Sequence, residues 1–577
     1  MIKLLIGLWG HFESKRRRQI GIVVILTILA SFAEVISIAA IIPFLGVLVT
    51  PEKFIDNKWA GVIVETFNLS SQDQIILPIT IIFIVVVILS GTIRLLLLRS
   101  LLQINMKLGA DLAYKIFSNS LYQDYSFHVK NNSSDIVSLI IEKTYQIVTH
   151  VIGPALVLFS NSIIFISILS ILAYINPILT LFAFSFFGLI YFIIIVLMKS
   201  KLSNNGLILS TTSPKVVKIV QEGLGGIRDI ISDSTQNVYT ELFGKFDRLK
   251  KTTQASSNFI GQSPRFMIET IGIVLIAVLS YYLTQYSEEG LVSAIPTLGM
   301  LVIGAQRMLP LLQQSFNSWS NIQSSTSVLN DALKYLDKPV VSNKIYSQSP
   351  IVFKENIRID NVSFAYENSD RVLDSINLTI PKGSRIGIIG STGSGKSTLV
   401  DIIMGLLEVN DGFVSVDGKP INKQWLNCIA HVPQDIFLTD STIAENIAFG
   451  VPQDEINYER VISSAKQAHI DSTIKRWKDG YKTTIGERGV RLSGGQRQRI
   501  GIARALYKKT SVIIFDESTS ALDIKTEKSI MESIDSLNTN LTIIIITHRL
   551  TLLKGCSKVF ELNNSHLSEV KSSFLTK

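Results

Sequence analysis

The run from Gly390 to Thr398 combines glycines, hydroxyl side chains and one lysine at a spacing typical of a loop that holds phosphate. Its glycines let backbone N–H groups approach phosphate oxygens, and the apolar helix expected to begin near Lys396 adds positive potential at its N-terminus. We therefore expect Lys396 to reach the terminal phosphates of a nucleotide and Ser397 to coordinate Mg²⁺. The predicted phosphate-binding residues are Gly390, Ser391, Thr392, Gly393, Ser394, Gly395, Lys396, Ser397 and Thr398.

Two neighbouring acids, Asp516 and Glu517, follow a second apolar run at 511–515. Asp516 fits a carboxylate that organises Mg²⁺, and Glu517 is placed to polarise an attacking water as general base. Alone, such a pair could also be two solvated acids at the end of a strand. Downstream of a phosphate-binding loop, the pair favours nucleotide hydrolysis.

These residues need a scaffold, and the short apolar runs around them predict a parallel sheet. Residues 385–389, 511–515 and 541–547 are bounded by turn residues and read as buried strands. We therefore predict an α/β P-loop ATPase domain over 351–577. Cys428 and Cys556 have no metal-ligand spacing, so both are expected to be reduced packing residues.

The first part of the chain is far more apolar. A bilayer core of about 30 Å needs about 20 helical residues, and six apolar runs are close to or above that length. We predict an all-α membrane domain over 1–320 and a linker over 321–350. The predicted spans are 20–49, 75–102, 150–175, 177–198, 266–286 and 292–315.

The net charge of +9 follows the predicted membrane sides. Basic residues gather at 15–18 and in the segment 199–263, whereas the short connections 172–176 and 287–291 contain none. Because basic residues collect on the cytoplasmic side, the N-terminus, the long connections and the ATPase domain are predicted to be cytoplasmic. This placement does not favour a nucleic-acid partner. Segment 50–74 is then an outer loop, either solvated or with a helix on the bilayer surface.

Taken together, the motifs resemble those of ABC transporters, specifically exporter-type half-transporters, over the whole chain. The resemblance implies that Tyr366 stacks on adenine. It also implies that Ser493, Gly494, Gly495 and Gln496, within Leu492–Gln496, complete the ATP site of a second copy. Because none of the motif positions is degraded, a homodimer with two competent sites is favoured.

The same resemblance assigns roles to further residues. Gln434 would touch Mg²⁺ and the attacking water, and His548 would contact the γ-phosphate. Residues 520–523 would cross the dimer seam, and Glu487 lies in a loop that would meet the membrane domain. Candidate contact helices lie near 125–135 and 223–233. Two ATP-bound domains closing together would then drive alternating access in the membrane half.

Charged residues inside the predicted spans are costly and are therefore candidates for cargo binding. Arg94, Arg265 and Arg307 lie towards the cytoplasmic ends of their spans, and Glu34 lies near the middle of the first. Three arginines around a cavity would suit a phosphate or pyrophosphate head group. Arg94 and Arg265 could instead extend to the interface, and Arg265 could pair with Glu269.

Several segments of the membrane half also resemble lipid-linked-oligosaccharide flippases of the PglK type. They are Ser31–Glu34, Ile42–Phe44, Leu224–Ile230, Ser263–Arg265 and Arg307–Pro310. This resemblance implies a lipid-linked oligosaccharide or a related polyprenyl-phosphate glycolipid as cargo, moved across the plasma (inner) membrane. An exporter of peptides, drugs or other lipids is the alternative, and a non-transporting regulatory membrane ATPase is an alternative of another class.

Overall fold

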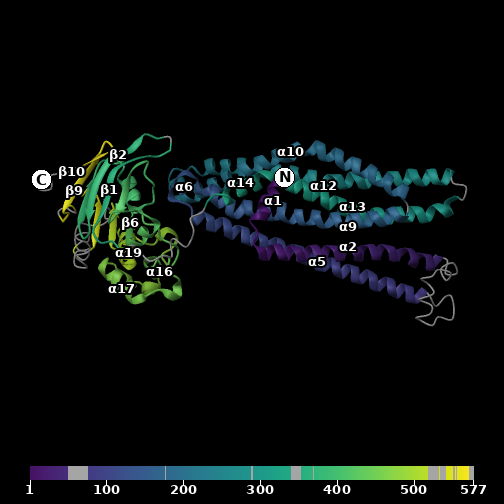
Figure 1. Cartoon of the computed structure of the whole chain (residues 1–577), viewed down its shortest axis with the longest axis horizontal. Coiled ribbons are helices and arrows are strands. Elements are labelled where there is room, and N and C mark those ends of the chain that lie inside the picture. The colour runs from purple at the N-terminus through teal and green to yellow at the C-terminus, as the bar shows by residue number, and fades with distance from the viewer. Residues whose placement is uncertain are drawn as a thin grey trace. The chain divides into compact units, whose positions relative to one another are not determined.

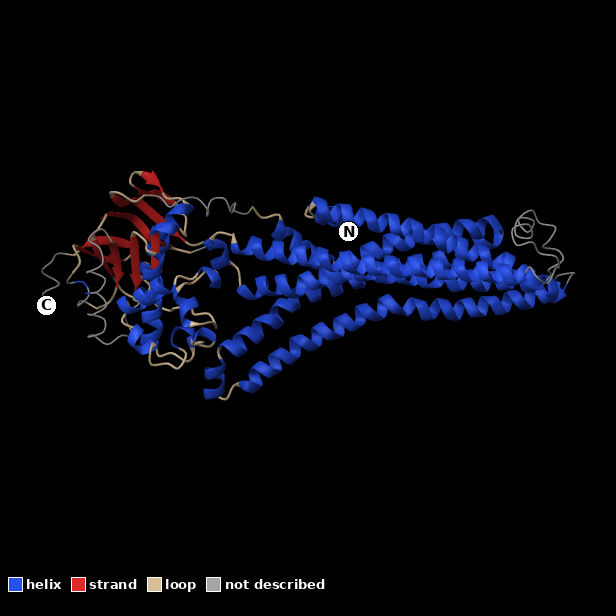
Figure 2. Cartoon of the chain, turned by 90° about the horizontal axis from the view of Figure 1, so that it is seen from below, coloured by secondary structure: helices blue, strands red, loops and turns tan. Residues whose placement is uncertain are grey.

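In the computed structural model, the chain folds into two compact units. The first unit comprises Met1–Gln123 and Lys130–Val340, and the second comprises Asp124–Val129 and Val341–Lys577. Helices make up the regular structure of the first unit, whereas the strands belong to the second (Figure 2). The structure describes residues 1–49, 76–175, 177–286, 290–339, 352–367, 369–517, 532, 541–549, 553 and 555–570.

The long helices of the first unit run roughly along a common direction (Figure 1). Short α6 (Tyr125–Lys130) lies where the two units divide, and η2 and η3 are π-helical turns. The helices are α1 (Ile2–Gly10), α2 (Ser14–Val49), α5 (Ile76–Leu121), α7 (Ser133–Ser138), η2 (Leu139–Lys143), α8 (Thr144–Ile147), η3 (Val148–Ile152), α9 (Gly153–Ile175), α10 (Pro177–Gly225), α11 (Ile227–Ser232), α12 (Gln236–Tyr286), α13 (Gly290–Ser324) and α14 (Thr326–Leu336).

The described residues of every predicted span are helical, and span 150–175 is divided between η3 and α9. Spans 75–102 and 177–198 lie in α5 and α10, and these helices run on to Leu121 and Gly225. Within the described residues, the helical stretches long and apolar enough to cross a membrane are Ser14–Ser37, Ile76–Leu121, Ser133–Ile171 and Phe184–Gly225. The remaining predicted spans fall in α12 and α13, and segment 50–74 lies outside the described residues.

The linker predicted over 321–350 begins too early. Helix α13 continues to Ser324, and α14 then packs its buried residues Val328, Leu329 and Leu333 within the first unit. The composition of this segment is polar, but its apolar residues recur at helical spacing, and that periodicity decides the structure. Residues 340–351 lie outside the described part.

Close helix packing in the first unit depends on small residues. A Cβ atom at Gly206 of α10 would lie 2.1 Å from the backbone oxygen of Ser324 in α13, so only glycine fits this crossing.

Near the N-terminus, Arg16 donates to both carboxylate oxygens of Asp111, at 2.6 and 3.0 Å, and so joins α2 to α5. Such bidentate pairs fix geometry as well as charge.

The second unit contains two sheets. The antiparallel sheet has the order β2-β1-β4-β5, and the second has the order β10-β9-β3-β8-β7-β6 with parallel pairing from β9 to β6. The strands are β1 (Asn356–Ala365), β2 (Arg371–Pro381), β3 (Arg385–Ile389), β4 (Asp411–Val416), β5 (Lys419–Pro420), β6 (Ile429–Val432), β7 (Val512–Asp516), β8 (Thr542–Ile546), β9 (Lys558–Asn563) and β10 (His566–Glu569).

The three strands predicted from the sequence are confirmed as β3, β7 and β8, each to within one residue. All five residues of β8 are buried, as expected of a central parallel strand. Because parallel strands end at the same edge of a sheet, the segments after β3, β6, β7 and β8 meet there. Besides most of α6, the helices described in this unit are α15 (Lys396–Met404), α16 (Ile443–Ile447), α17 (Tyr458–Gln467), α18 (Asp471–Ile474) and α19 (Gly494–Lys508), with short 3₁₀ turns between them.

Candidate functional site

The loop 390–395 joins β3 to α15, as the sequence predicted. Gly393 and Gly395 have φ angles of +82° and +101°, which favour glycine. A Cβ at Gly390 would lie 2.4 Å from the backbone oxygen of Leu562, so this position also excludes a side chain. The Lys396 Nζ donates to the carbonyl oxygens of Gly390 and Ser391 at 2.8 and 2.9 Å, and these bonds hold the loop around the lysine.

This loop fits a nucleotide phosphate. Helix α15 has no acidic residue in its first turn, so its N-terminal N–H groups meet no competing carboxylate there. The Ser394 Oγ is buried and has no hydrogen-bond partner among the described residues. A buried hydroxyl without a partner is rare, and a phosphate oxygen would supply one.

Asp516 ends β7 beside the loop. Burial raises the pKa of its carboxyl, and the neighbouring Glu517 carboxylate raises it further, whereas Lys396 and a hydrogen bond from Ser397 lower it. The site therefore brings the hydroxyl and carboxylate predicted to bind Mg²⁺ into contact. Mg²⁺ is commonly held by one or two carboxylates together with substrate phosphates, and this pair provides such oxygens.

Asp401 is a further acid of this site that the sequence reasoning missed. Burial and the nearby Asp516 carboxylate raise the pKa of Asp401 to about 6. The signal was present, because Asp401 follows Ser397 by four residues on the same face of α15.

Glu517 is held between the two other predicted catalytic residues. Its Oε2 accepts a hydrogen bond from Gln434 Nε2 at 3.1 Å, and its Oε1 lies 2.8 Å from His548 Nε2. Glu517 also has φ of +46°, a conformation that costs free energy for a residue with a side chain and that clusters at functional sites. These three residues come from the ends of β7, β6 and β8, and a water beside them would meet both a base and a hydrogen-bonding imidazole.

Tyr366, the predicted adenine platform, lies next to the phosphate loop. Its hydroxyl lies 3.2 Å from the Thr398 Oγ1, and its ring packs edge-to-face on Phe364 with centroids 5.0 Å apart. The ring is thereby fixed beside α15, so one face can be offered to a base.

The run Ser493–Gln496 forms the start of α19. Ser493 is the N-cap: its Oγ accepts from the Gln496 N–H at 3.3 Å, while the Gln496 side chain accepts from the Ser493 N–H at 2.9 Å. No acidic residue occurs in the first turn. The run is therefore a preformed helix N-terminus suited to an anion, although its serine and glutamine are already engaged in capping.

Of the other predicted elements, residues 520–523 lie outside the described part. Glu487 begins a 3₁₀ turn in which Arg488 has φ of +53°. Of the candidate contact helices, most of α6 belongs to the second unit, where the preceding Asp124 forms an ion pair with Lys423. The second candidate region contains α11.

The structure does not show the three arginines of the membrane half as one cluster. The Arg94 Nη1 lies 3.2 Å from Glu34, whose side chain is only 5% exposed, and Arg265 Nε lies 2.7 Å from Glu269 on the same helix. Arg307 is in α13, but its side chain is outside the described residues. Two of the three candidate cations thus have a carboxylate partner within this half.

Comparisons with known proteins agree with this geometry. The family model described as ABC transporter matches residues 373–520, and the model described as ABC transporter transmembrane region matches residues 20–306. The fold and site therefore define a membrane ATPase with one helical and one nucleotide-binding half. The chain belongs to the ABC transporter family, as an exporter-type half-transporter.

Its relatives include lipid flippases. The chain is 29% identical over 498 residues to the ATP-dependent lipid A-core flippase of Haemophilus influenzae (strain 86-028NP), an alignment that covers 84% of this chain and 83% of the relative. It is 27% identical over 513 residues to the protein of the same name from Idiomarina loihiensis, with 87% of each chain covered. The ABC transporter ATP-binding protein YwjA of Bacillus subtilis is 37% identical over 236 residues, which is 40% of this chain and 41% of YwjA.

A solved structure of a bacterial Atm1-family ABC exporter with ATP bound shows the same fold. Its TM-score is 0.77 with 20% sequence identity, and the match covers 96% of this chain and 94% of that structure. The chain is accordingly an ATP hydrolase that couples hydrolysis to transport across a membrane.

Proposed function

We propose that the protein is a homodimeric flippase of the inner membrane that uses ATP and Mg²⁺ to move a lipid-linked oligosaccharide, or a related polyprenyl-phosphate glycolipid, to the outer leaflet. The observation that carries a lipid cargo is the similarity, across both halves of the chain, to ATP-dependent lipid A-core flippases. The narrower glycolipid cargo rests on the sequence resemblance in the membrane half.

In this proposal, ATP is hydrolysed by residues that lie close together in the second unit. Lys396 binds the terminal phosphates, Ser397 and Asp516 hold Mg²⁺, and Glu517 takes a proton from the attacking water. Gln434 and His548 orient Glu517, to which both are hydrogen-bonded or ion-paired. Tyr366 offers a face to adenine.

The second half of each site comes from a second copy of the chain. Ser493, Gly494, Gly495 and Gln496 begin a helix with an anion-ready N-terminus, and this end would close over the nucleotide held by the partner. Closure brings the two ATPase domains together, and hydrolysis loosens the seam. The N-terminus and the ATPase domain face the cytoplasm, as the distribution of basic residues favours.

Arg94, Arg265 and Arg307 are the proposed contacts for the cargo head group. Guanidinium groups bind phosphate oxygens bidentately, so a pyrophosphate would compete with Glu34 and Glu269 for the first two arginines. Binding of the head group would then separate Glu34 from Arg94 and Glu269 from Arg265.

Flipping in proteoliposomes tests the cargo directly. The purified protein is reconstituted with a fluorescent lipid-linked oligosaccharide, a labelled lipid A-core glycolipid or a labelled phosphatidylcholine, and the outer-leaflet fraction is measured by chemical quenching. We expect ATP-dependent movement of the first lipid only, with Glu517→Gln as the inactive control. Movement of the lipid A-core glycolipid alone would select the second candidate, which the names of the relatives support.

Other outcomes identify the remaining alternatives. If no lipid moves and peptides or drugs stimulate ATP hydrolysis, the protein is an exporter of another cargo. If neither occurs and the membrane conducts ions without ATP, the protein belongs to the non-transporting class.

A further inference from the structure

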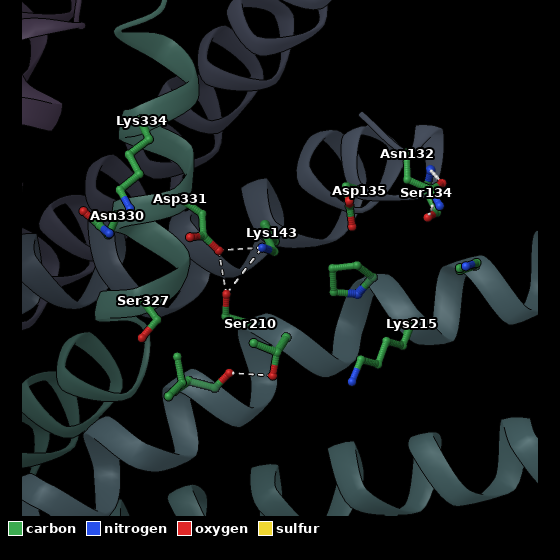
Figure 3. Close-up of a pocket in the computed structure, with 14 residues that line it drawn as sticks. Asn132, Ser134, Asp135, Lys143, Ser210, Lys215, Ser327, Asn330, Asp331 and Lys334 are labelled. Carbon is green, nitrogen blue, oxygen red and sulfur yellow. Dashed lines mark hydrogen bonds and ion pairs between the residues drawn. The ribbon is translucent and has the colours of Figure 1, made fainter. Parts of the chain in front are cut away.

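A cavity of about 600 Å³ opens within the first unit, and its lining residues lie outside the predicted spans (Figure 3). Its walls come from three segments: α7 with η2, the later part of α10, and α14. Concave sites of this volume hold small molecules. Nothing in the proposed transport cycle uses this cavity.

Positive charge dominates the lining of the cavity. Four lysines line it, Lys143, Lys215, Lys218 and Lys334, against two acids, Asp135 and Asp331. Lys143 is buried and contacts both Asp331, at 2.6 Å, and Ser210, so this lysine and Asp331 neutralise each other. Three lysines then remain against Asp135.

Lys218 and Lys215 have only weak partners. Lys218 lies 3.6 Å from Glu222 one helical turn away, and both side chains are about half exposed. The Lys215 Nζ lies 5.4 Å from the centroid of the Phe246 ring. Ion pairs of this exposed kind contribute little, so their charge is available to a ligand.

Lys143, Ser210 and Asp331 form a hydrogen-bonded triad in the wall of the cavity, in which Lys143 and Ser210 are buried. The Ser210 hydroxyl donates to Asp331 at 2.6 Å, and Figure 3 shows Lys143 bridging α14 and α10 through these two residues. Lys143 ends the π-helical turn η2, and the preceding Glu142 pairs with Lys250 of α12. Adjacent residues of one π turn therefore bind different helices, and π turns are often found at functional sites.

We propose that this cavity binds a phosphate group of a small anion. Lysine ammonium groups bind phosphate as point charges, and a phosphate with nearly two negative charges matches the excess positive charge of the cavity lining. Among the described residues that line the cavity there is no arginine, so no planar fork selects a carboxylate. Ser327 and Asn330 supply additional donors from α14.

The position along the helices favours a water-soluble ligand over a membrane lipid. Ser210 lies beyond the predicted end of its span at residue 198 by roughly 18 Å, at about 1.5 Å for each residue. Lipid head groups extend the bilayer by only about 5–8 Å on each side of the hydrocarbon core. A bound phosphate would tie α7, α10 and α14 together and favour one arrangement of these helices.

The test is pyrophosphate binding by calorimetry to the full-length protein in phosphatidylcholine nanodiscs. Lys396→Ala is the parent, because it weakens phosphate binding at the nucleotide site. In the cavity variant, Lys215, Lys218 and Lys334 are all changed to Gln. The matched control changes the exposed Lys199, Lys201 and Lys251 to Gln, which line no part of the cavity.

We expect the cavity variant to bind pyrophosphate at least about tenfold more weakly than the parent, and the control to match the parent. Added pyrophosphate should also raise the unfolding temperature of the parent and the control, but not of the cavity variant. Equal affinity in all three proteins, or no binding by the parent, would overturn the proposal.

A second arm separates the two sources of phosphate. The titrations are repeated in nanodiscs that contain phosphatidylglycerol. If phosphatidylglycerol leaves the pyrophosphate affinity of the parent unchanged, the ligand is soluble. If phosphatidylglycerol lowers the affinity only in proteins that keep the three lysines, the site binds a lipid head group.

Discussion

The nucleotide site and the candidate cargo residues hold their charges in different ways. In the nucleotide site, Asp401, Asp516 and Glu517 lie near one lysine, Lys396, so negative charge exceeds positive charge. In the membrane half, Arg94 and Arg265 are each matched by one carboxylate. Mg²⁺ would offset the excess negative charge of the nucleotide site, whereas Arg94 and Arg265 must each exchange a carboxylate for a phosphate oxygen to bind cargo. The lysine cavity also keeps a charge imbalance, of the opposite sign.

The largest expected effect tests the nucleotide side of this comparison. Glu517→Gln keeps the shape of the side chain but removes its capacity to accept a proton, so ATP turnover should fall at least about a hundredfold while ATP binding remains. Phosphate release and binding of a fluorescent ATP analogue measure the two properties. Phosphate release close to that of the unchanged protein would remove Glu517 from its proposed role.

Mixed dimers test whether each site is shared between two copies. Lys396→Ala and Ser493→Arg chains should each be inactive alone, but co-expression should restore roughly a quarter of the activity, because half of the dimers are mixed and each contains one intact site. The matched control combines both changes in one chain and mixes it with the unchanged chain, so that only the unchanged homodimers, about a quarter of the population, are active. Shared sites therefore give similar activity in the two mixtures. A first mixture without activity, beside a control that keeps about half, would exclude shared sites.

Arg307→Ala tests whether the membrane half binds an anionic head group. We expect flipping of the labelled glycolipid to fall at least about tenfold while ATP hydrolysis without cargo is retained, since a lost bidentate contact weakens binding of cargo alone. The two rates are measured in the same proteoliposomes. Unchanged flipping would take away the main argument for a phosphate-bearing cargo.

The pair of Arg94 and Glu34 should matter more to stability than the pair of Arg265 and Glu269. Arg94→Ala leaves a buried carboxylate without this partner and should lower stability by about 2 kcal/mol, less than for a fully buried pair because Arg94 is 53% exposed. Arg265→Ala should cost less than about 1 kcal/mol, since both members of its pair with Glu269 are substantially exposed. Denaturant unfolding in detergent compares the variants. A larger loss for Arg265→Ala would reverse this ranking.

Asp401 provides the smallest effect, which depends on pH. Its pKa of about 6 lies above the ordinary value of 3.8, so the ionised carboxylate destabilises the folded domain at neutral pH, and this penalty disappears as the pH falls through 6 towards 3.8. Asp401→Asn should therefore raise stability at about pH 7 by on the order of 1–3 kcal/mol and give no gain near pH 4. Unfolding of the nucleotide-free protein at both pH values checks this. A gain that is the same at both would contradict the assignment.

Local sequence patterns predicted the elements around the candidate nucleotide site, because these elements are specified by residues close in sequence. The glycines at 390–395, the strand before them and the acids after β7 are each specified within a few residues. The family resemblance, not the spacing, pointed to Gln434 and His548. Their contacts with Glu517 were not predicted, because they depend on the order of the parallel strands.

The extent of the helices in the membrane half was harder to predict. Apolar runs gave the positions of the spans, but α5, α10 and α12 extend far outside them, because these helices continue beyond the apolar residues as polar surface helices. The lysine cavity joins residues from three separate segments and has no short motif. Its only local signal was an excess of lysine, which membrane sidedness also explains.

The two π turns at Leu139–Lys143 and Val148–Ile152 have a consequence for how the segment from Ser133 to Ile175 can change. Each π turn accommodates one residue more than an α turn and shifts the phase of the helix by about 100°. The helix face that contacts neighbouring helices before the first π turn is therefore rotated relative to the face that contacts them after the second π turn. Deleting one residue there would leave a regular helix yet turn one end away from its partners, so this stretch should tolerate substitutions better than changes in length.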